Sequence, residues 1–302
     1  MSRIPKVVIT DFIAEPLDHE RRVLDGHAEI TALEAMCEED LKGRIEDAEA
    51  IMVYHYFRFT RASIERLTNC KVIVRPGVGY DGVDIEAARE HGIPVCNVPD
   101  YGTEEVADSA IGMAISLSRG IHFLNSRLRR GVGDWNVDQA MPVPRLRGQV
   151  FGIIGCGRIG AATALRAKTF GFDVAFYDPY LPDGVEKALG IRRVNQLSEL
   201  LGSSHVVSLH CPLTHETRSL IRKDELAQMR EGSVIINTSR GGVVDTVSVV
   251  EALASGHLSG AGIDVLEQEP SRATSEECGQ LINLARSRLR PAFWYTLRLR
   301  RG

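Results

Sequence analysis

A glycine-rich stretch and a carboxylate beyond it carry the strongest chemical signal in the sequence. Gly155, Gly157 and Gly160 are spaced as G-x-G-x-x-G between the apolar run 150–154 and a helix-prone run, and Asp178 follows the next apolar run. In dinucleotide-binding proteins such glycines let the backbone approach a pyrophosphate, and the carboxylate binds ribose hydroxyls. The pattern therefore predicts an NAD site, since a carboxylate here would repel the 2′-phosphate of NADP. The alternative is a glycine-rich turn in another kind of α/β protein.

Polar residues also follow three later strands that the sequence predicts. They are the loop 210–217, the turn 238–241 and Asp264. Ligands of parallel sheets bind outside the carboxyl ends of the strands, so these residues are expected near the glycine stretch. Arg240 could offer its guanidinium to a substrate carboxylate, or it could be an ordinary surface arginine. Glu269 could orient a histidine base, or it could belong to a solvated acidic loop.

The elements that position these residues alternate between strand and helix along the whole chain. The expected strands are 6–10, 29–33, 50–54, 72–74, 94–97, 150–154, 174–177, 205–209, 233–237 and 260–265. The expected helices are 16–24, 38–45, 60–67, 85–91, a long helix from about 103, 161–170, 194–201, 224–229 and 246–255. This alternation predicts an α/β fold with parallel sheets, in two series that divide near residue 100.

Composition narrows the class of protein without identifying a partner. A chain of 302 residues suits two domains, and its 44% hydrophobic and 25% charged content are typical of globular proteins. The net charge of −4 predicts no direct nucleic-acid binding, and no apolar run reaches the length of a membrane span. The six scattered cysteines predict reduced thiols and a cytoplasmic location. No metal site is expected, because His210 and Cys211 alone are too few ligands for zinc.

Four blocks of the sequence, taken together, resemble a known family. They are 75–84, 146–160, 211–217, and 237–245 followed by 261–270. In this order they are similar to the D-isomer-specific 2-hydroxyacid dehydrogenases, above all to the branch of C-terminal-binding proteins and related bacterial enzymes. The resemblance implies two Rossmann-like domains, with the NAD domain inserted into a flavodoxin-like substrate domain. The implied domains are 1–100 with 275–302 for substrate, and 101–274 for NAD, and family members usually form homodimers.

The resemblance also implies a role for individual residues. Arg240 would hold the carboxylate and keto oxygen of the substrate, and Glu269 would pair with a histidine acid/base. The backbone N–H groups of Val78 and Gly79 would bind the substrate carboxylate. The residues implied to line NAD are Thr103, Gly155, Gly157, Arg158, Ile159, Gly160, Asp178, His210, Cys211, Pro212, Thr217, Thr238, Ser239 and Asp264.

The sequence departs from the family pattern after Glu269. A Pro-His block should follow about twenty residues later, but 290–296 reads Arg-Pro-Ala-Phe-Trp-Tyr-Thr, and no histidine follows His257. The arginine-rich segment from about 271 is expected to be a disrupted C-terminus, with a natural divergent tail as the alternative. The expected function is NAD-dependent interconversion of a small D-2-hydroxy acid and its 2-keto acid, impaired by the missing histidine. The alternatives are an NAD(H)-sensing dimeric binding protein and an inactive chain that only binds NAD.

Overall fold

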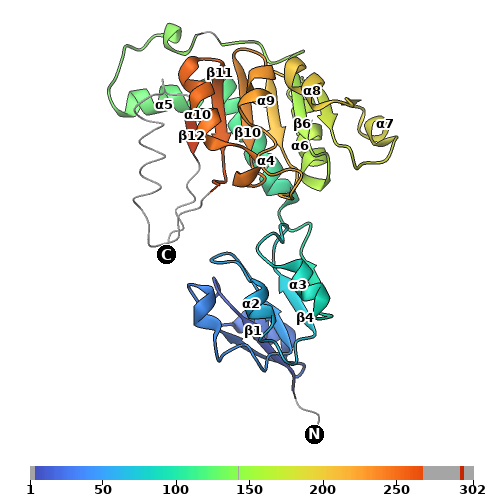
Figure 1. Cartoon of the computed structure of the whole chain (residues 1–302). Helices are drawn as coiled ribbons and strands as arrows, with labels where there is room; N and C mark the ends of the chain where they lie inside the picture. Colours follow the sequence, from blue (N-terminus) through green and yellow to red (C-terminus); the bar gives the residue numbers. More distant parts are fainter. Residues whose placement is uncertain (1–3, 142, 268–292, 296–302) are drawn as a thin grey trace. The chain divides into compact units, whose positions relative to one another are not determined.

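The computed structural model describes residues 4–141, 143–267 and 293–295. They form two α/β units that divide between Gly102 and Thr103 (Figure 1). Each unit has its own parallel sheet, so the predicted fold class of two Rossmann-like parallel-sheet domains is confirmed. Among the described residues, no helix is both long and apolar enough to span a bilayer.

The first unit contains a five-stranded sheet with the order β2-β1-β3-β4-β5. The strands are β1 Lys6–Ile9, β2 Glu29–Ala32, β3 Ala50–Met52, β4 Val72–Arg75 and β5 Val95–Asn97. Every neighbouring pair is parallel. This is the strand order of flavodoxin-like folds, in which ligands bind at the carboxyl ends of the strands.

Both faces of the first sheet are covered by apolar side chains. Successive residues of a strand point to opposite faces, so Val8 packs in one core while Val7 and Ile9 pack in the other with Leu17. The connecting elements are the helices α1 Asp18–Leu24, α2 Arg61–Ile64 and α3 Ile85–Glu90, and the 3₁₀ turn η1 Glu38–Leu41. The helix expected over 38–45 is only this short turn, because Gly43 adopts a φ of +77° that an α-helix does not allow.

The second unit contains a seven-stranded parallel sheet with the order β12-β11-β10-β9-β6-β7-β8 (Figure 1). The strands are β6 Val150–Ile154, β7 Asp173–Tyr177, β8 Arg192–Arg193, β9 Val206–Leu209, β10 Ser233–Asn237, β11 Leu258–Ile263 and β12 Phe293–Tyr295. Counted from β6, six strands follow the 3-2-1-4-5-6 order of dinucleotide-binding folds, and a seventh lies beyond them. The strand order reverses between β6 and β9, which is where such folds bind their ligand.

Helices cover both faces of the second sheet. On one face α4 Thr103–Ser118 packs against α6 Arg158–Thr169, and their small residues Ala110 and Ala164 are fully buried between helices and sheet. The other face is covered by α8 Leu197–Ser203, α9 Lys223–Gln228 and α10 Thr246–Ser255. The shorter elements are α5 Ile121–Arg129, α7 Val185–Leu189, η2 Val137–Ala140 and η3 Gly241–Val243.

All ten expected strands are present, and the differences lie in short or polar elements. The strand β8 consists of two arginines and α7 of five residues, so neither has the apolar periodicity that predicts an element. The assignment of 275–302 to the first domain is wrong for β12, which pairs in parallel with β11 of the second sheet. The rest of that segment and its boundary at 274 lie outside the described residues.

Candidate cofactor and substrate site

The sheet order brings the predicted cofactor residues to one edge. The strands β7, β6, β9, β10 and β11 are consecutive neighbours, so their carboxyl ends lie side by side. Asp178, the glycine stretch 155–160, the loop 210–217, the turn 238–241 and Asp264 follow these five ends in that order. The strand-end reasoning from sequence therefore predicts their clustering correctly.

Each glycine of the G-x-G-x-x-G stretch has its own structural reason. Gly155 adopts a φ of +84°, and a Cβ there would lie 2.8 Å from the backbone N of Cys211. A Cβ on Gly160 would lie 2.1 Å from the carbonyl oxygen of Gly155. At Gly157, by contrast, a Cβ would meet no atom within 4 Å. Two glycines therefore allow close packing of the loop, whereas Gly157 borders open space beside the start of α6.

The N-terminus of α6 is suited to bind a phosphate. Its N-cap residue is Gly157, and no side chain caps the helix. The first-turn residues Arg158 and Ile159 offer backbone N–H groups that an α-helix cannot satisfy internally. Together with the helix dipole, these groups attract an anion such as a pyrophosphate.

Asp178 is held beside this loop by backbone hydrogen bonds. One carboxylate oxygen accepts from the N–H of Cys156 at 2.9 Å, and the other accepts from the N–H of Tyr180 at 3.0 Å. The N–H of Gly155 donates to the carbonyl of Tyr177 at 3.0 Å, so the loop and the end of β7 are joined twice. Each carboxylate oxygen has capacity for a further donor, which fits the two hydroxyls of a ribose.

The loop that follows β9 presents a neutral imidazole. His210 Nε2 lies 2.9 Å from the hydroxyl of Ser208, and Nδ1 is buried with no hydrogen-bond partner among the described residues. Burial lowers the pKa of His210 to about 3, so the ring is neutral near pH 7. Burial likewise raises the pKa of the Cys211 thiol to about 11. In the described ranges, no group of three or more His, Cys, Asp or Glu side chains is placed to hold a metal ion.

The rest of this loop is braced by its own side chains. Thr217 Oγ1 donates to the carbonyl of Pro212 at 2.6 Å and accepts from the N–H of Thr214 at 2.8 Å. The Tyr180 hydroxyl, from the segment after Asp178, donates to the Glu216 carboxylate. The loops after β7 and β9 are therefore linked, as expected if both line the same site.

Asn237, which sequence reasoning did not select, organises the turn that carries Arg240. Its Oδ1 accepts from both the N–H and the hydroxyl of Ser239, at 3.1 and 2.8 Å, and its Nδ2 donates to the carbonyl of Arg240 at 3.0 Å. Its own carbonyl accepts from the N–H of Asp264 at 3.0 Å. Asn237 is fully buried at a strand end, and a buried asparagine must satisfy its amide. An amide side chain at the end of an apolar run is the sequence signal that could have identified Asn237.

Two unsatisfied atoms suggest where a ligand group completes the site. The hydroxyl of Thr238 is buried without a partner among the described residues, as is Nδ1 of His210 on the neighbouring strand end. A buried polar atom without a hydrogen bond costs about 1–3 kcal/mol, so a bound molecule that reaches these atoms gains by satisfying them. Together with the helix terminus and Asp178, these groups fit a dinucleotide.

Two further residues that the sequence predicted for the site lie elsewhere in the chain. Thr103 is buried at the start of α4, and Glu269 lies outside the described residues.

In the first unit, the loop with Val78 and Gly79 is fixed at a strand end. Asn97 Nδ2 donates to the carbonyl of Val78 at 2.7 Å, and the N–H of Val98 donates to the carbonyl of Gly77 at 3.1 Å. A Cβ on Gly77 would lie 1.4 Å from a guanidinium nitrogen of the buried Arg75, so a larger residue there would require this side chain to move. The loop can therefore present backbone N–H groups in a defined geometry.

A second residue that sequence reasoning missed is Asp11, at the end of β1. Its carboxylate is fully buried and accepts from the backbone N–H groups of Tyr54, His55 and Tyr56 at 2.9, 2.6 and 2.7 Å. It also accepts from the hydroxyl of Thr10 at 2.6 Å. One carboxylate thus shapes the whole loop after β3, which adjoins the Val78 loop because β3 pairs with β4.

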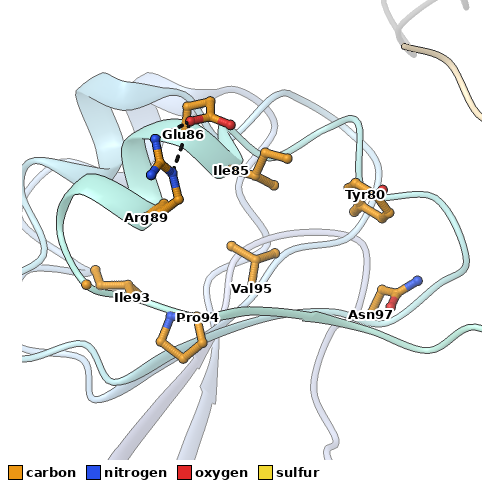
Figure 2. A pocket seen from close by; sticks show the side chains of 9 residues that line it. Tyr80, Ile85, Glu86, Arg89, Ile93, Pro94, Val95 and Asn97 are labelled. Carbon is orange, nitrogen blue, oxygen red and sulfur yellow. Dashed lines mark hydrogen bonds and ion pairs between the residues drawn. The ribbon is translucent and has the colours of Figure 1, made fainter.

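The pocket drawn in Figure 2 lies in the first unit and adjoins the Val78 loop through Tyr80 and Asn97. It has a volume of about 580 Å³ and is lined by residues of α3 and β5, with Ile93 and Pro94 just before β5 and an exposed Glu86–Arg89 ion pair on α3. It contains none of the predicted site residues. The candidate site is therefore defined by the strand ends and not by this pocket.

The comparison with known proteins identifies the family. The sequence model described as "D-isomer specific 2-hydroxyacid dehydrogenase, NAD binding domain" matches residues 111–289. The chain belongs to this family. The predicted family and the predicted NAD cofactor are both confirmed, since the matched region is the family's NAD-binding domain.

Individual members of the family show how far the likeness extends. D-3-phosphoglycerate dehydrogenase of Methanocaldococcus jannaschii is 35% identical over 88% of this chain, which covers 50% of that protein. C-terminal-binding protein 1 of Caenorhabditis elegans is 36% identical over 82% of this chain and 34% of its own. The chain thus spans half or less of these relatives. The crystal structure of D-lactate dehydrogenase from Aquifex aeolicus, complexed with NAD and lactic acid, has a TM-score of 0.85 at 27% identity, over 96% of this chain and 87% of that one.

Proposed function

We propose that the chain is an NAD-dependent oxidoreductase that interconverts a small D-2-hydroxy acid and its 2-keto acid. The observation that carries the proposal is the turn after β10, where Asn237 holds the half-buried Arg240 at the strand end beside the cofactor residues. A guanidinium in that place suits a carboxylate, because it offers two parallel N–H donors. The likeness to a D-lactate dehydrogenase complexed with NAD and lactic acid supports the same substrate class.

The proposed roles divide between binding and orientation. NAD, when bound, supplies or accepts the hydride at C2 of the substrate. The start of α6 holds the pyrophosphate and Asp178 holds the ribose. Arg240 orients the substrate through its carboxylate and keto oxygen. In the first unit, the N–H groups of Val78 and Gly79 are suited to bind a carboxylate. The loop from Cys211 to Thr217, with Thr238 and Asp264, flanks the adenosine and the nicotinamide, and Thr103 approaches the nicotinamide ring.

The same proposal includes an impaired rate. The chain's histidines are 19, 27, 55, 91, 122, 205, 210, 215 and 257, and none follows Glu269. A general acid/base contributes about 10²–10⁴-fold to the rate of a reaction of this kind. His210 is a poor substitute, because burial lowers its pKa to about 3 and so favours a neutral ring near pH 7. We therefore infer slow hydride transfer with intact cofactor binding.

NADH oxidation with glyoxylate, hydroxypyruvate or pyruvate as acceptor tests this function. We expect slow turnover by the wild-type chain and a further loss of about 10–100-fold in kcat/KM for Arg240→Ala, because a charged hydrogen bond contributes about 1.5–3 kcal/mol. Arg240→Lys should recover only part of the lost kcat/KM, since an ammonium lacks the planar pair of N–H donors of a guanidinium. The exposed Arg222→Ala serves as the control with wild-type rates. No turnover at high enzyme concentration would refute the enzyme function.

The alternative is an NAD(H)-sensing dimeric binding protein, which the likeness to C-terminal-binding protein 1 favours. The segment around α5 supports a homodimer, since it exposes a run of large apolar side chains. They are Ile121, Leu128, Val132, Trp135 and Met141, of which Trp135 is 88% exposed. Isolated exposed apolar residues are ordinary, but a cluster of them marks an interaction surface. We also propose a cytoplasmic location, supported by free thiols at all the described cysteines.

Sedimentation of the full chain tests the homodimer. We expect a dimer for the wild type and a monomer for Leu128→Asp with Trp135→Asp, because two carboxylates cannot be buried in an apolar interface without partners. Val247→Asp, at an equally exposed position on α10, should remain dimeric. A monomeric wild type, or a dimeric double variant, would contradict the assignment of this surface.

A further inference from the structure

Arg193 binds the segment that follows Asp178 with an unusual number of hydrogen bonds. From β8, its Nη1 donates to the carbonyl oxygens of Asp178 and Leu181, at 3.4 and 3.1 Å. Its Nη2 donates to the carbonyl oxygen of Pro182 at 2.6 Å. A single guanidinium therefore gathers three backbone carbonyls of one turn.

The same side chain is fixed at its other edge. Nε donates to the Glu186 carboxylate at 3.2 Å, and that carboxylate accepts from the N–H of Gly184 at 3.1 and 3.2 Å. The guanidinium also lies over the ring of Phe176, 4.9 Å from its centre, and only 16% of the Arg193 side chain is exposed. Arg193 thus connects β7, the turn after it and the start of α7.

This arrangement reaches Asp178, the carboxylate proposed above to bind the ribose. Asp178 Oδ1 accepts from the N–H of Tyr180, and Tyr180 lies within the turn whose carbonyls Arg193 holds. If the turn changed shape, that N–H would move and Asp178 would keep only its bond from Cys156. The orientation of the Asp178 carboxylate therefore depends on the guanidinium of Arg193.

A cation near the ribose could instead favour NADP by attracting its 2′-phosphate. Here the guanidinium is already engaged by four oxygen atoms, from Asp178, Leu181, Pro182 and Glu186. Binding a phosphate would require it to release several of them. The contacts therefore favour a role in holding the protein rather than in attracting the phosphate.

We propose that Arg193 is a positioning residue that gives the chain its preference for NAD over NADP, by holding the turn 178–182 so that Asp178 faces the ribose. The proposal rests on the NAD-dependent function proposed above and deepens it. It concerns only the second unit, and binding alone can test it.

The test compares Arg193→Met with Arg192→Met, its neighbour on β8. Arg192 is exposed, and its one ion pair among the described residues is with Glu199 on α8, so its removal should change the affinity by less than about twofold. Dissociation constants for NADH and NADPH are measured by nucleotide fluorescence on the full chain. For Arg193→Met we expect the Kd of NADH to rise about 10-fold and the Kd of NADPH to change far less. The preference for NADH over NADPH should therefore shrink.

An unchanged preference in Arg193→Met, or an equal loss of both nucleotides, would overturn the proposal. Arg193→Lys keeps one cation that can reach fewer oxygens, so it should show an intermediate preference. If Arg193→Met does not fold, Arg193→Lys provides the test instead. A wild-type preference for NADH over NADPH in Arg193→Lys would then refute the positioning role of Arg193. A wild-type chain that binds neither nucleotide would refute the NAD-dependent function itself. Wild-type binding with an unaltered Arg193→Met refutes only the role of Arg193.

Discussion

Gly160→Ala is expected to abolish measurable NADH binding and to destabilise the second unit. The new methyl carbon would lie 2.1 Å from the carbonyl oxygen of Gly155 and 3.3 Å from a methyl of Ile153. Neither can withdraw easily, because Gly155 is bonded to Tyr177 and packed against Cys211. Overpacking of this kind costs about 1–3 kcal/mol or more, and relief of the clash would move the start of α6 from the loop. Denaturant unfolding and NADH fluorescence measure the two effects.

Gly157→Ala is the matched comparison, three residues earlier in the same loop. Its φ of −68° suits alanine, and a methyl there would meet no protein atom within 4 Å. Stability should therefore stay within about 0.5 kcal/mol of wild type, as for a surface substitution. NADH affinity should still fall, because the methyl occupies the space through which the pyrophosphate approaches the backbone. Normal NADH binding by Gly160→Ala would contradict this account of the loop.

Asp11→Ala is expected to lower the stability of the first unit by about 3 kcal/mol or more. Three consecutive, partly buried backbone N–H groups, those of Tyr54, His55 and Tyr56, would lose their charged acceptor, and a hydrogen bond to a charged group contributes about 1.5–3 kcal/mol. Asp11→Asn should recover little, because its amide nitrogen would face N–H donors in place of an oxygen. Hydrogen exchange of the first unit, with NADH binding as a check on the second, measures the effect.

The exposed Asp25→Asn provides the control for charge alone and should unfold as the wild type does. Retention of wild-type protection at Tyr54 to Tyr56 in Asp11→Ala would show that the loop after β3 does not depend on this carboxylate. Loss of protection across both units would mean that the effect is not confined to the first. The expected result is loss of protection in the first unit, with NADH binding retained.

The parts of the fold that the sequence predicts correctly depend on local information. Apolar runs and glycines at fixed spacing identify the strands from β1 to β11, apart from β8, and the turn after β6. The strand-end rule then places Asp178, His210 and Thr238 at one edge, because parallel strands carry their carboxyl ends together. The elements that the sequence did not predict carry no such local signal. The strand β8 is two arginines, and β12 joins the second sheet only through pairing with β11.

The sequence by itself determined the family, the two-unit α/β class and the dinucleotide stretch, because these follow from residue types at fixed spacing. Only the tertiary structure decided which polar residues hold that site in shape. Asp11 binds a loop more than forty residues away, and Arg193 binds carbonyls eleven to fifteen residues before it. Such partners are backbone groups that every residue carries, so no residue type marks them in advance. Folding selects them, because a buried charge must find hydrogen bonds wherever the chain provides them.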